Sequence, residues 1–228
     1  MPRERWVKAE FHCHTVYSKD SLTELKDLLK RAEKLGIDRL CITDHNTIQG
    51  ALKAKSMDAE RVIVGEEILT TQGELLAFFV KEEIPARLEP QEAIARLRDQ
   101  GAFISVSHPY DLNRYGWELD ELQEITPLVD AIEVFNARCI EPAINTKAQE
   151  YALEHQLLGT VGSDAHGLSE VGRCTLELPA FNDAESLRAS LKLAEQNVRL
   201  SSPSAHMISV WARIVKHYRA SRKTKLSE

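Results

Sequence analysis

Short apolar runs rich in β-branched residues alternate along the chain with longer amphipathic stretches. The apolar runs predict seven strands, at residues 6–11, 39–43, 61–64, 75–80, 103–106, 131–135 and 158–161. Apolar positions repeat with helical spacing at residues 21–35, 47–56, 90–100, 141–155 and 183–194. Ser21 and Glu24 have the spacing of a capping box at the start of the first of these helices. The predicted order is therefore βαβα over most of the chain.

Alternating strands and helices predict an α/β fold in which helices cover a mainly parallel sheet. Seven strands in a chain of 228 residues favour a closed or nearly closed barrel, with a doubly wound open sheet as the alternative. The sequence has no internal repeat, no low-complexity tract and no Gly-Ser linker, and residues 82–90 are interpreted as a surface connection. We therefore expect one domain over residues 1–200.

Residues 201–228 differ from the rest of the chain, because they carry six basic residues and one acidic residue in an apparently amphipathic helix. The favoured interpretation is a C-terminal helix that packs Met207, Val210, Trp211 and Ile214 on the barrel and leaves its lysines in solvent. A contact with RNA is the weaker alternative.

The overall composition is that of a globular protein, with 43% hydrophobic and 28% charged residues. A formal net charge of -6 argues against a general nucleic-acid binder. The four cysteines form no CxxC pair, which is typical of reduced thiols. The first residues contain no apolar signal region, and no apolar run reaches membrane-spanning length, so we expect a cytoplasmic protein without membrane contact.

Candidate metal ligands recur where predicted strands end, and these ends converge on one face of an α/β barrel. The histidines there are His12, His14, His45, His108 and His166, and the carboxylates are Asp44, Glu66, Glu67 and Asp164. His12 and His14 are two residues apart, so a strand places both rings on one face, although an isolated pair of this kind could also be a surface feature. Imidazole together with carboxylate suits Zn, Mn or Fe.

The segments FHCHTVYSKDS, TDHNT, SHP and GSDAHG, which span residues 11 to 167, resemble the four motifs of the PHP (polymerase and histidinol phosphatase) superfamily, in the same order. The resemblance implies a distorted (β/α)7 TIM-like barrel that binds two to three divalent metal ions. It assigns the first metal, and with it catalysis, to His12, His14, Glu66 and Asp164. Glu66 would bridge to a second metal held by His108 and a group near Asn136, and a third would be held by Asp20, His45 and His166.

Several of these assignments have alternatives in the sequence. Glu67 could bridge in place of Glu66, Asp20 could instead cap a helix, and the amide of Asn136 would be a poorer ligand than a histidine. Asp44 is expected to hydrogen-bond a metal-bound imidazole rather than to bind metal. The remaining histidines, His155, His206 and His217, are given no metal role.

Arg138 and Arg173 follow two of the ligand-bearing strand ends and are predicted to bind a substrate phosphate through paired hydrogen bonds. The chain has no serine-hydrolase elbow and no Walker loop, so a metal-bound hydroxide is the expected nucleophile. The resemblance is to small stand-alone PHP phosphoesterases that act on nucleotides or short RNA 5′ ends. The alternatives are a histidinol-phosphatase-like phosphomonoesterase and a non-catalytic, metal-stabilised binding module; the oligomeric state is left open.

Overall fold

The structure is a computed structural model that describes residues 5–226, and it describes side chains as far as residue 222. Residues 1–4 and residues 227–228, the last two of the basic tail, lie outside the described part. The strands are β1 (Trp6–Glu10), β2 (Arg39–Ile42), β3 (Val62–Leu69), β4 (Glu74–Phe78), β5 (Phe103–Val106), β6 (Ala131–Asn136), β7 (Leu158–Gly162), β8 (Cys174–Pro179) and β9 (Glu195–Val198). The α-helices are α1 (Leu25–Lys34), α2 (Gln49–Met57), α3 (Pro90–Asp99), α4 (Leu119–Ile125), α5 (Pro142–Glu154), α6 (Ala184–Leu191) and α7 (Ala205–Leu226).

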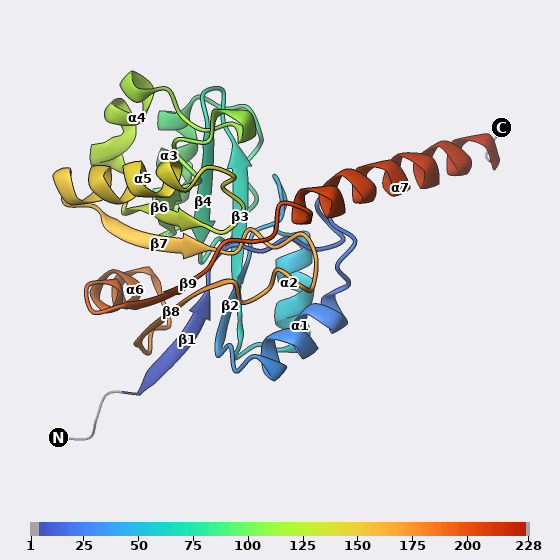
Figure 1. Cartoon of the computed structure of the whole chain (residues 1–228), viewed down its shortest axis with the longest axis horizontal. Helices are drawn as coiled ribbons and strands as arrows, with labels where there is room; N and C mark the ends of the chain where they lie inside the picture. Colours follow the sequence, from blue (N-terminus) through green and yellow to red (C-terminus); the bar gives the residue numbers. More distant parts are fainter. Residues whose placement is uncertain (1–4, 227–228) are drawn as a thin grey trace.

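The strands form one sheet in the order β7-β6-β5-β4-β3-β2-β1-β8-β9. A parallel bridge between Cys13 and Ala165 joins the chain just after β1 to the chain just after β7. The backbone N–H of His14 donates to the carbonyl of Ala165 at 2.9 Å across the same junction. Strands β1 to β7 therefore close almost completely on themselves, and the hairpin β8–β9 extends the sheet beside β1 (Figure 1). The distorted TIM-like barrel predicted from the sequence is confirmed.

The sheet is mixed rather than mainly parallel, because β4 runs antiparallel to both β3 and β5. Only four residues separate β3 from β4, too few for a helical crossover, so these strands form a hairpin. The first residue of β4, Glu74, consequently lies at the same edge as the carboxyl ends of the parallel strands. This reversal adds an acidic side chain to that edge.

Buried aromatic rings fill the centre of the barrel. The ring centroid of Phe11 lies 5.3 Å from that of Phe78 and 6.0 Å from that of Phe181, and Phe78 in turn lies 5.8 Å from Phe103. All four side chains are completely buried, and each contributes about 1.5–3 kcal/mol by leaving water. A packed interior of this kind fixes the strand ends that carry the polar residues.

The first helix begins later than the sequence predicted. Helix α1 begins at Leu25, and its cap residue Glu24 makes no side-chain capping bond. The Ser21 hydroxyl lies 3.2 Å from the carbonyl oxygen of His14 and 3.0 Å from that of His166, so it connects two strand ends instead of capping a helix. The predicted capping box is therefore wrong.

Helix α7 contacts the barrel only along one narrow face and then projects away from it (Figure 1). Ala205, Ser209 and Ala212 are the buried positions, because their side chains are small enough for close contact with the barrel. The expected packing residues Met207, Val210, Trp211 and Ile214 are exposed instead, so that prediction is wrong. Within residues 5–226, no helix is both long enough and apolar enough to cross a bilayer.

Candidate metal centre

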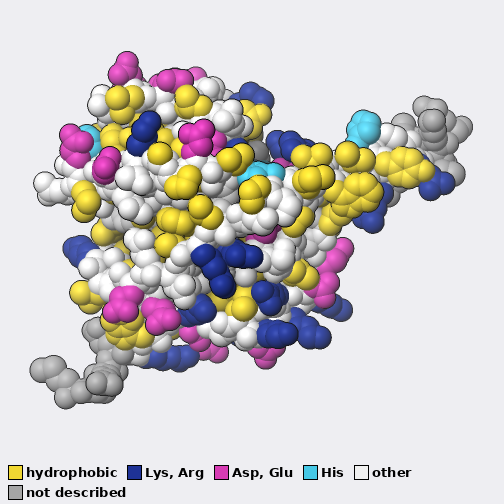
Figure 2. All heavy atoms as spheres, in the orientation of Figure 1, with side chains coloured by type: hydrophobic (Ala, Val, Ile, Leu, Met, Phe, Trp, Pro, Cys, Tyr) yellow, Lys and Arg dark blue, Asp and Glu magenta, His cyan; other side chains and the backbone are white. Residues whose placement is uncertain are grey.

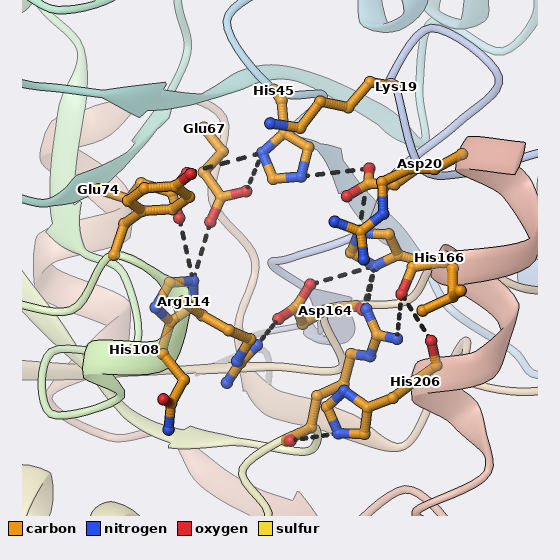
Figure 3. A pocket seen from close by; sticks show the side chains of 16 residues that line it. Lys19, Asp20, His45, Glu67, Glu74, His108, Arg114, Asp164, His166 and His206 are labelled. Carbon is orange, nitrogen blue, oxygen red and sulfur yellow. Dashed lines mark hydrogen bonds and ion pairs between the residues drawn. The ribbon is translucent and has the colours of Figure 1, made fainter. Parts of the chain in front are cut away.

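Histidine and carboxylate side chains from six segments of the barrel converge at one edge of the sheet (Figure 3). They follow β1, β2, β5 and β7 or belong to β3 and β4, and they are His12, His14, His45, Glu67, Glu74, His108, Asp164 and His166. The backbone of Asp164 has a φ of 49°, in the left-handed region that aspartate tolerates better than most residues. This convergence brings together side chains up to 154 positions apart in the sequence.

The first group combines His12 and His14 with Asp164 and Glu67. Nε2 of His12 lies 3.1 Å from Nε2 of His14 and 3.7 Å from Oδ1 of Asp164. Nε2 of His14 lies 3.3 Å from the same aspartate oxygen and 3.4 Å from Oε2 of Glu67. Four ligands at roughly 2.0–2.1 Å from one ion at the corners of a tetrahedron would be about 3.3 Å apart. The spacing of these atoms therefore suits one divalent transition-metal ion.

A second group forms around Asp20, which comes from the loop before α1. Its Oδ1 lies 3.4 Å from Nε2 of His45 and 3.4 Å from Nε2 of His166. The rings of His14 and His166 have centroids 4.2 Å apart, so this group adjoins the first. Asp20 precedes α1 by several residues and does not cap it, so the helix-cap alternative for this side chain is wrong.

A third group forms around Glu67 and Glu74. Nε2 of His108 lies 3.2 Å from Oε1 of Glu67 and 3.4 Å from Oε2 of Glu74. Nδ1 of His45 lies 2.8 Å from Oε2 of Glu67, so this glutamate stands between the three groups. Glu74 could not be identified from the sequence, because the start of a parallel strand would lie at the opposite end of the barrel.

The two adjacent glutamates of β3 have different surroundings, because successive side chains of a strand point to opposite faces. Glu67 contacts the histidines, whereas Oε2 of Glu66 accepts a hydrogen bond from the backbone N–H of Ile84 at 3.0 Å. Burial raises the pKa of Glu66 to about 8, and the hydrogen bond from Ile84 opposes that rise. The structure thus does not bring Glu66 into the centre, and the position predicted for it is occupied by Glu67, the alternative that the sequence left open.

Two buried carboxylates orient the rings of the first group from behind. Glu133 of β6 accepts a hydrogen bond from Nδ1 of His12 at 2.9 Å, which turns Nε2 toward the centre. Nδ1 of His14 lies 3.1 Å from the hydroxyl of Ser18, which donates to Asp44 at 2.6 Å. Asp44 therefore supports an imidazole as predicted, but through a serine rather than directly. Glu133 was not identified in the sequence, where it falls inside an apolar strand run.

Asn136 lies beside the centre but its amide is occupied by protein partners. Its Nδ2 donates to Glu133 at 2.9 Å and to Asp164 at 3.2 Å. Its Oδ1 accepts from the backbone N–H of Arg138 and from Arg114. Because the oxygen already accepts two hydrogen bonds, the structure gives Asn136 a supporting position rather than the ligand position predicted for it.

The electrostatics of the centre favour bound cations. Burial by itself raises the pKa values of Glu67 and Asp164, but the charge of His12 and of other nearby cationic groups outweighs burial and holds both well below their usual range. Burial and the charges of His166 and His45 lower the pKa of His14 to about 3, so its ring is neutral, as a metal ligand must be. Burial and the charge of Glu67 raise the pKa of Glu74 to about 7.

Two carboxylate oxygens of the centre, Asp20 Oδ1 and Glu67 Oε2, are buried and accept no hydrogen bond, although histidine nitrogens lie 3.4 Å and 2.8 Å from them. Such an oxygen costs free energy unless a cation or a donor compensates it. Among the described side chains, three sets have ligand atoms close enough to share an ion: His14, His45 and His166; His12, His14 and Asp164; and His45, Glu67 and Glu74. The residues therefore fit divalent metal ions with mixed nitrogen and oxygen ligands.

Several cationic side chains line the pocket over the centre, and Arg114 is one of them (Figure 3). Arg114 forms an ion pair with Asp164 and donates to Asp111 at 2.8 Å. It belongs to a single turn of 3-10 helix, which has no sequence signature, so it was not predicted. Lys19 and Arg213 line the same pocket, and so does the exposed ring of Tyr115.

The two arginines predicted to bind phosphate have different positions. Arg138 lines the pocket but is buried, and its guanidinium donates at 3.0 Å both to the carbonyl oxygen of Ala205 and to the hydroxyl of Ser209. Arg138 also lies 2.8 Å from Nδ1 of His166. Arg173 begins the β8–β9 hairpin and is not among the residues that line the pocket. His206, which was given no metal role, lines the pocket and hydrogen-bonds the carbonyl oxygen of Arg138.

Comparison with known families gives two matches along the chain. The sequence profile of the PHP domain matches residues 10–118, and that of the PHP-associated domain matches residues 142–195. Two uncharacterized proteins of Methanocaldococcus jannaschii are similar in sequence. MJ0417 is 39% identical over 184 residues, which cover 77% of this chain and 72% of that protein. MJ1587 is 36% identical over 157 residues, which cover 62% of this chain and 89% of that protein.

Solved structures share the fold. PsfC from Pseudomonas syringae has a TM-score of 0.66 and 20% identity, covering 94% of this chain and 99% of PsfC. A putative metal-dependent phosphoesterase from Bifidobacterium adolescentis has a TM-score of 0.58 and 20% identity, covering 80% and 95%. The lesion-specific endonuclease PfuEndoQ from Pyrococcus furiosus has a TM-score of 0.57 and 14% identity, covering 87% of this chain and 60% of the endonuclease. At these identities the similarity establishes the fold alone.

Proposed function

This chain belongs to the PHP domain family, and from that premise we propose that it is a metal-dependent phosphoesterase. The observation that carries the proposal is the group of His12, His14, Glu67 and Asp164, whose ligand atoms have the mutual distances of a transition-metal site. Two structural neighbours are described as a putative metal-dependent phosphoesterase and a lesion-specific endonuclease, and both of these classes of enzyme break phosphate ester bonds. This similarity supports the same class of reaction for the present chain.

We propose that the centre holds two to three divalent ions, of Mn, Zn or Fe. His12, His14, Asp164 and Glu67 would bind the first, with Glu67 shared by a second ion that His108 and Glu74 complete. Asp20, His45 and His166 would bind the third. When bound, the ions would polarise a phosphoryl oxygen and lower the pKa of a water molecule, which makes hydrolysis possible near neutral pH.

The protein side chains have separate tasks around the ions. Glu133 holds His12, and Ser18 with Asp44 holds His14, so both rings are fixed before substrate binds. Arg114 is the cation best situated to hold a substrate phosphate, because it lies in the pocket beside Asp164. The sequence predicts Arg138 for phosphate binding. Its hydrogen bonds to Ala205 and Ser209 support a different task, which is to hold α7 against the centre.

We propose that the substrate is a nucleotide or the 5′ end of a short RNA. The cations Lys19, Arg114 and Arg213 in the pocket support an anionic substrate. The ring of Tyr115, which is 55% exposed and lines the same pocket, offers a surface on which a base could stack.

We propose a cytoplasmic location for the protein. The four cysteines are free and buried, which agrees with a reducing environment.

We further propose residues 1–200 as the catalytic unit and residues 201–228 as a basic helical extension that borders its pocket. The second of the two family profiles ends at residue 195, before this extension begins. Val210 and Arg213 of α7 nevertheless line the pocket, so the extension takes part in shaping it.

The adjacent glutamates of β3 provide a matched pair of variants for testing the function. Glu67→Gln should lower kcat/KM for a phosphomonoester at least 100-fold and reduce the bound metal, because an amide is a weaker ligand than a carboxylate. Glu66→Gln should stay within about threefold of wild type, because a glutamine oxygen can still accept the hydrogen bond from Ile84. Steady-state kinetics on the Mn-loaded protein, with elemental analysis of both variants, provide the measurement.

Equal activity in the two variants would contradict the assignment of the centre. A wild-type protein that binds metal but hydrolyses no phosphate ester would instead favour the non-catalytic, metal-stabilised module. A preference for histidinol phosphate over nucleotides would favour the histidinol-phosphatase-like alternative.

A further inference from the structure

Helix α7 carries a stripe of large apolar side chains on the side that faces away from the barrel. The stripe consists of Met207, Trp211, Ile214 and Tyr218, whose side chains are 71%, 62%, 56% and 60% exposed. Figure 2 shows these apolar side chains along the projecting helix. Their spacing of four, three and four residues is the heptad spacing with which one helix packs against another. Exposed apolar surface of this kind marks a site of association.

The opposite face of α7 is fixed to the barrel. Ala205, Ser209 and Ala212 are buried, and Arg138 holds the first turn through two hydrogen bonds. Lys216 donates hydrogen bonds to the carbonyl oxygens of Val16 and Ser18. These contacts use the positions that lie half a turn away from the stripe, so the barrel cannot cover the stripe without losing them.

We propose that the stripe pairs with the same stripe of a second copy of this chain, so that two α7 helices cross antiparallel about a twofold axis between Trp211 and Ile214. In this arrangement Trp211 of each copy packs against Ile214 of the other, and Met207 packs against Tyr218. A shared patch that is complementary to itself is the usual form of a dimer interface. The proposal does not depend on the proposed function.

The apolar area is large enough for such an interface. Large side chains present roughly 150–250 Å² each, so the exposed fractions of the four amount to about 500 Å² per copy and about 1,000 Å² for the pair. Specific interfaces begin at about this size and obligate dimers bury about twice as much, so the area fits a reversible dimer rather than an obligate one.

The charges of α7 select the antiparallel arrangement. Residues 205–212 contain no lysine or arginine, whereas Arg213, Lys216, Arg219 and Arg222 follow in the next ten positions. A parallel pair would place the two basic halves side by side, which is unfavourable. An antiparallel pair places each basic half beside the uncharged half of the other helix.

The same charges argue against a nucleic acid or a lipid surface as the partner that covers the stripe. The stripe itself contains no cation, and Lys216 is engaged by the barrel. Because residues 201–228 hold six basic residues and one acidic residue in a chain of net charge -6, the first 200 residues carry a net charge of -11. A body of that charge repels polyanions and anionic lipids.

Pairing would also affect the pocket. Val210 borders the stripe and lines the pocket, and Arg213, three residues further along, lines it as well. The helix of the second copy would therefore lie next to the pocket mouth and narrow its open side.

The molecular mass in solution tests the proposal. Light scattering on the full chain at tens of micromolar should give about twice the 25.7 kDa of one chain. Trp211→Glu combined with Ile214→Glu should give a monomer, because like charges would then oppose each other across the axis. Leu153→Glu is the control, since Leu153 of α5 is 80% exposed away from the stripe and its replacement should leave the dimer intact. Unchanged circular dichroism and melting temperature would show that the stripe variant still folds.

Cysteine pairs test the orientation of the helices. Met207→Cys with Tyr218→Cys should form a cross-linked dimer under mild oxidation, whereas Met207→Cys alone should not. Cross-linking of Met207→Cys alone, a monomeric wild type, or a stripe variant that remains a dimer would each overturn the proposal. So would a monomer whose binding to single-stranded RNA is lost in the stripe variant, because the stripe would then be a nucleic-acid contact.

Discussion

Around the centre, two side chains of the same type can have different roles because they point in different directions. Glu66 and Glu67 are chemically identical and adjacent, yet one contacts four histidines and the other a backbone amide. Glu133 and Asn136 lie behind the ligand groups, and their hydrogen bonds set which nitrogen of His12 faces the centre and how Asp164 is oriented. At this scale, function depends on the direction of a side chain more than on its type.

Tyr115 allows the proposed substrate class to be tested with one side chain. Its φ of 57° lies in the left-handed region, so Tyr115→Asn removes the ring while suiting that backbone. Loss of base stacking, worth about 1–3 kcal/mol, should raise KM for a nucleoside monophosphate about tenfold or more and leave KM for glycerol phosphate unchanged. Tyr115→Phe keeps the ring and is the control. An equal change of KM for both substrates would show that Tyr115 does not recognise a base.

The residues that could be predicted from the sequence are those that follow a recognisable strand. His12, His14 and Asp164 end apolar runs, so their convergence follows from the barrel itself. Arg114 could not be found in this way, because it lies in a loop with no periodic pattern. The choice between Glu66 and Glu67 depends on which side chains of β3 point into the barrel. A continuous apolar run does not show this, because it has no alternation of apolar and polar residues.

At the scale of elements, the predicted strands and helices were found with shifts of a few residues, whereas the direction of β4 and the existence of β8, β9 and α4 were not predicted. The hairpin β3–β4 explains Glu74, since reversing one strand brings its first residue to the edge where the other strands end. The large apolar residues of α7 look the same in sequence whether they face a barrel or solvent. The small residues Ala205, Ser209 and Ala212, which decide that question, carry little signal.

Asp130 joins three elements and provides a test of their packing. Its carboxylate accepts hydrogen bonds from Arg98 of α3 and from Arg188 of α6, each at 2.7 Å, and from the backbone N–H of Ile104 in β5 at 2.8 Å. Asp130→Asn should lower the free energy of unfolding by about 1.5–3 kcal/mol, the range for hydrogen bonds to charged groups. Urea unfolding at pH 7 measures this. Glu92→Gln, in an exposed pair with Arg96, is the control and should cost less than about 1 kcal/mol.

The difference in unfolding free energy between wild type and Asp130→Asn should depend on pH in one direction. Burial alone would raise the pKa of Asp130, but the hydrogen bonds from Arg188 and Arg98 outweigh burial and hold the pKa below its ordinary value of 3.8. The stabilisation is therefore complete above pH 3.8 and is lost as the pH falls through the lower pKa of the folded state. The stabilities of wild type and Asp130→Asn should converge in that acidic range. A difference that stays constant down to pH 2 would mean that the charge of Asp130 does not matter.

At the scale of the whole molecule, the centre lies at the junction of β1 and β7 that closes the barrel. His14 donates to Ala165 where β1 meets β7, and Asp164 and His166 lie on either side of that junction. Ions bound to His12, His14 and Asp164 would therefore link the first and last strands of the barrel. Metal binding should consequently stabilise the whole fold and not only the site.

Thermal unfolding of metal-free and metal-loaded protein tests this connection. An ion at 100 times its dissociation constant adds about 2.7 kcal/mol of stability. In a chain of this length that corresponds to a rise in Tm of about 5–10 °C per ion. We expect Mn or Zn to raise Tm by at least this amount, with two to three equivalents bound by elemental analysis.

Asp164→Ala should abolish most of the rise, because it removes a ligand at the junction of β1 and β7. His217→Ala is the control, since His217 lies on the projecting part of α7 and should leave both the rise and the bound metal unchanged. Less than about one equivalent of bound metal in the wild type, or a rise in Tm that Asp164→Ala leaves intact, would contradict a metal centre at this junction.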